Sequence, residues 1–251
     1  MRAFSVMIYR QIKRFGRARS RVAGMIINPL IWLVFFGVGW SGVFRGARVF
    51  GGVDYLTYLA PGIFAMTIFN QSFISGISVI WDKEFGFLKE VLVAPASRKE
   101  SIAGRIVGDS IVATIQGLVI LLLTFLLTNL RLAGVIPSLA VGFLLAVAFS
   151  SFGVGIATRM ESMEGFQMIM GVLMLPLIFL SGAIYPINVM PGWMMMLAYL
   201  NPLTYAVDSA RHFLVGRGAN FTILLDVSVL IILASVFLGV AMIAFERATI
   251  E

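Results

Sequence analysis

The side chains that could perform enzymatic chemistry are few in this sequence of 251 residues, and their spacing matches no catalytic motif. None of its four lysines follows a glycine, so it lacks the Gly-x-x-x-x-Gly-Lys-Ser/Thr loop that holds nucleotide phosphates. Its one histidine, His212, cannot form a His-Glu-x-x-His zinc site, and the absence of cysteine excludes disulfides, thiolate metal sites and cysteine nucleophiles. We therefore expect no catalytic residue, metal or cofactor in this chain.

Acidic side chains inside long apolar segments would indicate ion-coupled transport, and the sequence has two, Asp109 and Asp226. Each lies near one end of its segment. Asp109 is four residues from Arg105, which predicts a local ion pair on a helix face. The centres of the segments carry hydroxyl groups and no charges. If the protein moves a solute, we expect the energy to enter from outside the membrane core.

The apolar segments reflect the composition, which is 60% hydrophobic and 12% charged, against about 25% charged residues in soluble domains. Helices can keep such apolar outer faces in lipid, and a span needs about 20 residues to cross a hydrocarbon core of about 30 Å. The sequence therefore predicts an all-α membrane protein with one transmembrane domain, residues 1–251. We expect six spans, at residues 22–44, 56–80, 106–130, 135–158, 166–187 and 221–245.

Residues 1–21 predict an amphipathic helix that lies in the membrane interface. Its apolar side comprises Phe4, Met7, Ile8, Ile12 and Phe15, and its basic side comprises Arg2, Arg10, Lys13, Arg14 and Arg17. Seven of the 19 basic residues lie in this segment, so the basic charge fits anionic lipid head groups and not nucleic acid. No cleavage site follows it, and we expect the segment to be retained.

The distribution of arginine and lysine predicts the orientation of the spans. With the amino terminus in the cytoplasm, most basic residues outside the spans fall on the cytoplasmic side, as the positive-inside rule requires. We expect a multi-pass protein of the cell (inner, cytoplasmic) membrane with both termini inside.

Between the fifth and sixth predicted spans, residues 188–220 combine prolines and aromatics with an apolar stretch too short to cross a bilayer. This pattern is typical of re-entrant helices, which we place on the outer surface. Asp208 is followed by Arg211 three residues later and by His212 four residues later, so a local pair that orients the outer helix is expected there. Glu161 and Glu164 precede the fifth span, where they either cap its helix or form a cytoplasmic entrance.

The charged segment 81–105, between the second and third spans, contains a short amphipathic stretch at residues 84–95. As a helix, it has Phe85, Leu88, Val91 and Leu92 on one face, Glu84, Lys89 and Glu90 on other faces, and Pro95 at its end. An apolar stripe on a helix too short to span must contact lipid, the spans or a partner protein.

Motifs at four places along the chain resemble the membrane subunits of type-2 ABC exporters, the group with drug-resistance, nodulation-factor and polysaccharide exporters. They are YLAPGI at 58–63, EFGFLKEVLVAPASR at 84–98, LSGAIYPI at 180–187 with MPGW at 190–193, and NPLTYAVDSAR at 201–211. The resemblance covers nearly the whole chain. It implies that the second motif docks as a coupling helix on a separate ABC ATPase. The coupling residues would be Glu84, Phe85, Phe87, Leu88, Lys89, Val91, Leu92 and Pro95.

The same resemblance implies two facing copies of this subunit and two ATPase subunits, which would bind ATP and Mg²⁺. It also implies a substrate path along the second and fifth spans. The candidates are Met66, Phe69, Asn70 and Phe73, and Met170, Met174 and Leu177, both sets at helical spacing. Adaptable methionines and aromatics suit a lipid-like or drug-like ligand, although ordinary helix packing or lipid contact gives the same pattern.

The sequence thus predicts the permease subunit of an ATP-driven exporter for an amphipathic, lipid-like, drug-like or glycan substrate. The alternative is a membrane scaffold or assembly subunit whose cytoplasmic loop only recruits a partner. An ion-coupled carrier is disfavoured, because charges are missing at mid-membrane depth.

Overall fold

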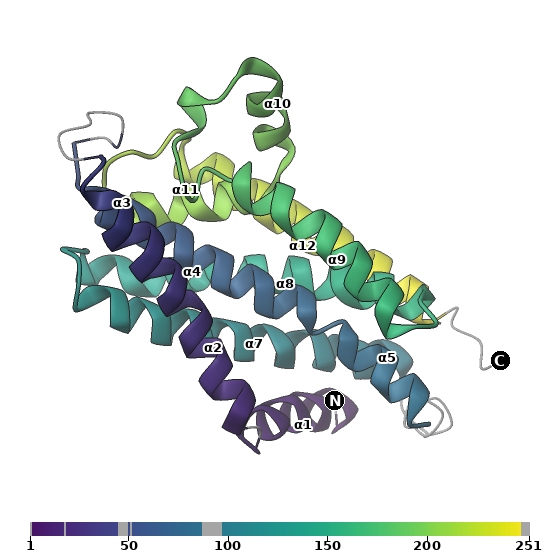
Figure 1. Ribbon diagram of the computed structural model, residues 1–251. Coiled ribbons are helices and arrows are strands. Elements are labelled where there is room, and N and C mark those ends of the chain that lie inside the picture. Colours follow the sequence, from purple (N-terminus) through teal and green to yellow (C-terminus); the bar gives the residue numbers. More distant parts are fainter. Residues whose placement is uncertain (1, 18, 45–49, 51, 87–96, 247–251) are drawn as a thin grey trace.

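The computed structural model describes residues 2–17, 19–44, 50, 52–86 and 97–246, and every regular element in these ranges is a helix (Figure 1). The predicted all-α class is confirmed. Four described helices are long and apolar enough to cross a membrane, Tyr55–Glu84, Arg98–Phe125, Leu132–Arg159 and Ile223–Glu246. Two shorter apolar helices, Ile27–Ser41 and Met163–Phe179, lie where the first and fifth spans were expected.

The elements follow one another along the chain in a simple order. They are α1 (Arg2–Arg17), α2 (Arg19–Trp32), a π-helical turn (Leu33–Val38), α3 (Gly39–Ser41), α4 (Tyr55–Ile74), α5 (Ile77–Glu84), α7 (Arg98–Phe125), a 3₁₀ turn (Leu132–Gly134), α8 (Val135–Arg159), α9 (Met163–Phe179), a 3₁₀ turn (Ile187–Val189), α10 (Gly192–Leu200), α11 (Pro202–Leu214) and α12 (Ile223–Glu246).

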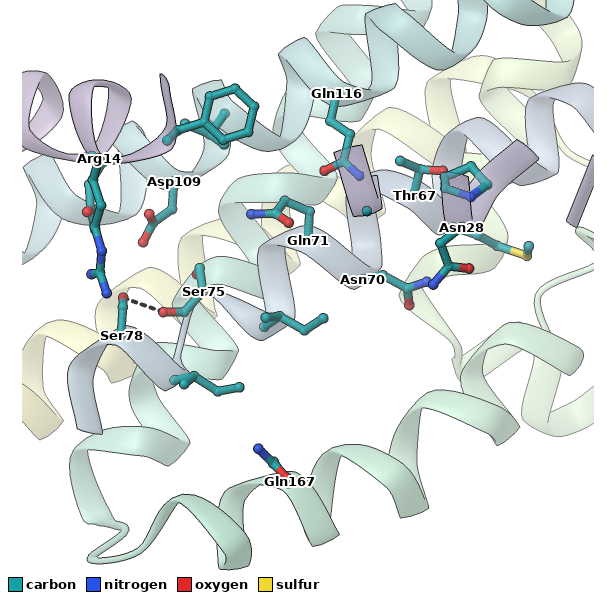
Figure 2. A pocket seen from close by; sticks show the side chains of 18 of the residues that line it. Arg14, Asn28, Thr67, Asn70, Gln71, Ser75, Ser78, Asp109, Gln116 and Gln167 are labelled. Atoms are coloured by element: carbon teal, nitrogen blue, oxygen red, sulfur yellow. Dashed lines mark hydrogen bonds between the residues drawn. The ribbon is translucent and has the colours of Figure 1, made fainter. Parts of the chain in front are cut away.

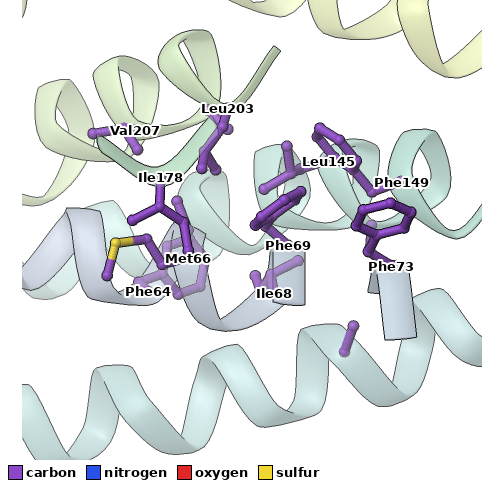
Figure 3. Packing of buried hydrophobic residues seen from close by; sticks show 14 of the residues in the cluster. Phe64, Met66, Ile68, Phe69, Phe73, Leu145, Phe149, Ile178, Leu203 and Val207 are labelled. Carbon is purple, nitrogen blue, oxygen red and sulfur yellow. The ribbon is translucent and has the colours of Figure 1, made fainter. Parts of the chain in front are cut away.

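Helix α4 forms the centre of the bundle and packs against α7, α8 and α11. Its aromatic side chains build the core, where Phe69 and Phe149 meet edge to face with centroids 4.5 Å apart (Figure 3). Phe73 is equally buried and contacts both Phe149 and Phe166. Such aromatic pairs add to the stabilisation from area burial.

A glycine pair lets the junction of α4 and α5 approach α8. A Cβ atom on Gly76 would lie 2.5 Å from the backbone oxygen of Gly153, and a Cβ on Gly153 would lie 2.6 Å from that of Phe73. Small residues allow backbones to pack this closely within a membrane, where van der Waals contact drives helix association. The break between α4 and α5 is therefore held directly against α8.

The fifth apolar helix ends earlier than expected. Residues 166–187 were predicted as one span, but α9 stops at Phe179, and Gly182 has a φ of +73° that a helix cannot contain. The chain then turns back onto α4, where Tyr58 donates a hydrogen bond to the Gly182 carbonyl at 3.0 Å. Tyr55 donates likewise to the Ile184 carbonyl at 3.2 Å. These contacts replace the last helical turns.

The segment predicted to be re-entrant, residues 188–220, contains the two short helices α10 and α11. Figure 1 shows α10 projecting from the side of the bundle, whereas α11 packs against α4, α8 and α12. The expected pair between Asp208 and Arg211 is wrong. Asp208 accepts hydrogen bonds from the backbone N–H groups of Asn220 and Phe221, at 2.8 and 2.9 Å. Arg211 has other partners.

Arg211 is fully buried and stabilises the turn after α9. Its guanidinium carbon lies 3.8 Å from the centre of the Tyr58 ring, and Nη2 donates to the Gly182 carbonyl at 2.9 Å. An arginine over an aromatic ring gains a cation–π interaction, which is stronger where water is excluded. Both partners of Arg211 are distant from it in the sequence. They lie together because the turn at Gly182 brings the Gly182 carbonyl next to α4.

Candidate functional site

A cavity of about 430 Å³ opens between α1, α2, α4, α5, α7 and α9. Uncharged polar side chains from several helices line it, and Figure 2 shows among them Asn28 from α2, Thr67, Asn70 and Gln71 from α4, Ser78 from α5, Gln116 from α7 and Gln167 from α9. Its volume lies in the range of about 300–1,000 Å³ that is usual for small-molecule sites. The cavity can therefore hold an organic ligand within the apolar part of the bundle.

One end of the bundle, which we name the loop end, is where α5 ends and α7 begins. Helix α12 also ends there, because Lys99 of α7 forms an ion pair with Glu246 at 3.3 Å. Helix α1 reaches the same end, since Arg10 contacts Asp82. The predicted cytoplasmic segments therefore share one end of the molecule.

An ion cluster at the loop end joins three helices. Asp82 of α5 accepts two hydrogen bonds from Arg10 of α1, at 2.8 and 3.2 Å, and one from Arg105 of α7 at 2.7 Å. Arg105 also donates to the Ser78 hydroxyl at 2.6 Å, and its side chain is only 2% exposed. The predicted pair of Arg105 with Asp109 is therefore wrong, because Arg105 binds Asp82, which is farther away in the sequence.

The next residue of α5 ties the same helix to α8. The Lys83 ammonium donates hydrogen bonds to the carbonyls of Thr158 and Met160 at the end of α8, at 2.5 and 3.2 Å. These carbonyls have no partner within their own helix, and a cation there also complements the negative end of the helix dipole. Helix α5 is thus fixed to α1, α7 and α8 at once.

The faces of α1 differ from the prediction. Met7 is buried, as expected for the apolar side, but Arg10 and Arg14 of the predicted basic side turn toward the protein. The Arg14 guanidinium lies 5.2 Å from the Trp81 ring centre. Tyr9 is exposed instead. The helix packs along α7, and the side of α1 that faces inward carries Arg10, which binds Asp82 of α5.

The predicted coupling residues lie beside this cluster or outside the described chain. Glu84 is the last residue of α5, and Phe85 follows with 82% of its surface exposed. Gly86, with a φ of +75°, ends the helix, so Glu84 does not begin a new helix as expected. The other predicted coupling residues lie outside the described residues: Phe87, Leu88, Lys89, Val91, Leu92 and Pro95.

The predicted path residues divide into two groups. Met66 and Asn70 line the cavity. Phe69 and Phe73 do not, because both are fully buried in the aromatic core against α8. Of the four residues predicted on α4, this cavity therefore exposes Met66 and Asn70.

Helix α9 presents a different face to the cavity from the one predicted. Met170 is buried in the core, and Met174 and Leu177 are partly buried and pack against the core. Among the described residues of α9, Met163, Gln167 and Ile178 line the cavity. The prediction missed these residues and also the amides of α2 and α7. Amide side chains inside apolar spans are the signal that could have found Asn28, Gln71 and Gln116.

The start of α9 shows how the preceding acidic residues are used. Ser162 caps the helix by accepting a hydrogen bond from the Gly165 N–H at 3.1 Å, and Glu164 lies in the first turn. A carboxylate in the first turn stabilises the positive end of the helix dipole. The geometry favours the capping role for Glu164.

Comparison with known proteins identifies the family of this chain. The family model described as ABC-2 type transporter matches residues 2–215. The chain is 34% identical over 208 residues to a protein of Cyanophora paradoxa named as a transport permease, ycf38, covering 81% of this chain and 70% of that one. It is 25% identical over 243 residues to the daunorubicin resistance ABC transporter permease protein DrrB1 of Streptomyces coeruleorubidus, covering 94% and 83%. The chain therefore belongs to the ABC-2 type transporter family, as a permease subunit.

Proposed function

We propose that this permease exports an amphipathic substrate from the cytoplasm, as a dimer driven by a separate ABC ATPase. The observation that carries the proposal is the cavity between α1, α2, α4, α5, α7 and α9, which combines an apolar wall with amide side chains. The relative from Streptomyces coeruleorubidus, named for daunorubicin resistance, supports an organic substrate. The two copies of the ATPase would bind ATP and Mg²⁺, since this sequence has no phosphate-binding loop.

The loop end supplies a route for mechanical coupling. Residues 87–96 connect α5 to α7, and both helices are joined through Asp82 and Arg105. A force on the loop would act on α5 and α7 together, and through Arg10 on α1. Rigid-body movement of packed helices about such joints is a common way to switch between two states. In this proposal the loop end faces the cytoplasm of a cell membrane, with both termini inside.

The dimer would bring a second copy to the open side of the cavity. The outer face of α9 exposes Met168, Val172 and Leu175, and this face would meet either the second copy or lipid. A single chain encloses about 430 Å³, so a pair of cavities would give a larger substrate a path between the subunits.

Replacing Leu88 or Leu92 with aspartate should prevent docking of the ATPase. A charge on the apolar stripe of a docking helix would have to be desolvated at the interface, which is costly. We expect the permease carrying Leu88→Asp to lose co-purification with a co-expressed partner ABC ATPase, and to lose ATP-dependent transport in proteoliposomes.

The matched control is Leu132→Asp, because Leu132 is exposed at the opposite end of the bundle. This variant should retain the complex and transport. Wild-type levels of both in Leu88→Asp and Leu92→Asp would contradict docking through this loop. A wild-type complex that forms but moves no substrate would instead point to a scaffold.

A further inference from the structure

The cavity is graded in polarity along its length. At the end away from the loop, α4 contributes Ile63 and Met66. One to two turns nearer the loop end, it contributes Asn70 and Gln71. Figure 2 shows that Arg14 and Asp109 lie together toward one side of the cavity, whereas Asn28 and Asn70 lie toward the other. Toward the loop end, the polar lining therefore changes from an amide zone, Asn70 and Gln71, to a charged zone, Arg14 and Asp109, while apolar residues such as Ile74 and Trp81 lie beside both.

The amide zone lies at the middle of the membrane-spanning length. Asn70 is halfway along the apolar helix Tyr55–Glu84. Polar side chains at such depth are costly and usually have a function. The Oδ1 atom of Asn70 is buried and accepts no hydrogen bond from the described residues. Buried polar atoms are normally satisfied, so this oxygen is placed to accept a hydrogen bond from a bound molecule.

The charged zone has no excess of either sign. Among the described residues that line the cavity, Arg14 is the one cation and Asp109 the one anion. Their formal charges are opposite, so the described cavity lining carries no formal net charge. A head group with a net charge would therefore lose its hydration without gaining an opposite charge that is free to compensate it.

We propose that the amides of this cavity select an amphiphile whose polar group is uncharged and rich in hydrogen-bond donors and acceptors, such as a sugar or a polyhydroxylated ring. The polar group would contact Asn70, Gln71 and Gln116, and the apolar body would lie against Ile63, Met66 and Trp32. Neutral amides both donate and accept, which matches hydroxyl groups. This inference rests on the proposed export function and names the class of substrate for the same site.

Photoaffinity labelling of the full chain in lipid nanodiscs, without ATPase, tests the proposal. Three probes share one twelve-carbon tail with a diazirine and differ in the head group, which is glucoside, trimethylammonium or sulfonate. We expect the glucoside probe to label peptides of α4 and α7 at least threefold more than either charged probe. Excess unlabelled dodecyl glucoside should compete with that labelling.

Variants connect the labelling to the amides. Asn70→Leu and Gln71→Leu should each lower glucoside labelling by about three- to tenfold, as expected for the loss of one neutral hydrogen bond. Asn129→Leu makes the same chemical change at an exposed site outside the cavity and should leave labelling unchanged. Asn70→Asp should reverse the preference toward the trimethylammonium probe, a result that misfolding cannot produce.

Several results would overturn the proposal. These are equal or stronger labelling of the cavity by a charged probe, no labelling of α4 and α7, or unchanged labelling in both leucine variants. Because the assay needs neither ATP nor a partner, it is independent of export. Labelling as expected in a protein that fails to transport would refute the proposed function and leave the binding site intact.

Discussion

Asp82→Asn is expected to lower the free energy of unfolding by about 3–5 kcal/mol, the cost of removing one partner from a buried ion pair. The substitution leaves Arg105 buried and Arg10 partly buried, with no carboxylate between them. An asparagine accepts fewer hydrogen bonds and carries no charge, so it cannot replace the bidentate contact with Arg10. Titration of the purified protein with SDS in mixed micelles, followed by tryptophan fluorescence, measures the change.

The control for this prediction is another ion pair at the same end. Glu246→Gln breaks the contact with Lys99, in which both side chains are about half exposed. Exposed pairs contribute about 0–1 kcal/mol, so this variant should remain close to wild type. If Asp82→Asn lost no more stability than Glu246→Gln, the ion cluster would not hold α1, α5 and α7 together.

Gly76→Val is expected to have the second large effect, because its side chain would occupy the position of the α8 backbone. The first added carbon would lie 2.5 Å from the Gly153 oxygen and 2.7 Å from the Gly153 carbonyl carbon. Backbone cannot move aside as the end of a side chain can, so α5 must shift away from α8. Overpacking of this kind costs about 1–3 kcal/mol and occasionally more.

The same SDS titration measures this variant against Gly171→Val. Gly171 lies on α9, and a Cβ atom added to it would have no heavy atom of a neighbouring element within 4 Å, so valine there should leave the stability near that of wild type. Equal stability of the two valine variants would show that α5 does not depend on direct backbone contact with α8.

Much of the architecture follows from local sequence patterns. The apolar segments predicted the helices α4, α7, α8 and α12, because length and hydropathy are properties of contiguous residues. The amphipathic pattern of residues 1–21 predicted α1 for the same reason. The early end of α9 was harder to predict. It depends on Gly182 and on hydrogen bonds to this turn from two tyrosines of α4. These tyrosines precede the turn by more than a hundred residues in the sequence.

The ionic partners could not be read from spacing. Asp109 is the nearest acid to Arg105 within α7, yet Arg105 binds Asp82, and Arg10 reaches Asp82 from 72 residues away. Local spacing predicts a pair only where no stronger partner approaches from another helix. Here Asp82 is the stronger partner, because it binds Arg10 through two hydrogen bonds and Arg105 is buried beside it. Asp208 likewise binds backbone N–H groups beyond α11.

The candidate site was predicted in part. Helical spacing placed Met66 and Asn70 on one face with Phe69 and Phe73, but the two phenylalanines pack into the aromatic core. Positions three or four residues apart share a face, yet neighbours in space decide which part of that face meets a cavity. Gln116 and Asn28 come from other helices, so no pattern within α4 could reveal them.

Site-specific photocrosslinking from Phe85 shows whether the loop after α5 contacts the ATPase, as we propose. Phe85 is 82% exposed beside the ion cluster, and Phe35 is 69% exposed in the first apolar helix, which makes it the matched control. A p-benzoylphenylalanine at each position is irradiated in membranes that contain the co-expressed ATPase. We expect a permease–ATPase adduct from position 85 and none from position 35. No adduct from position 85, with the ATPase present and the permease folded, would contradict this proposal.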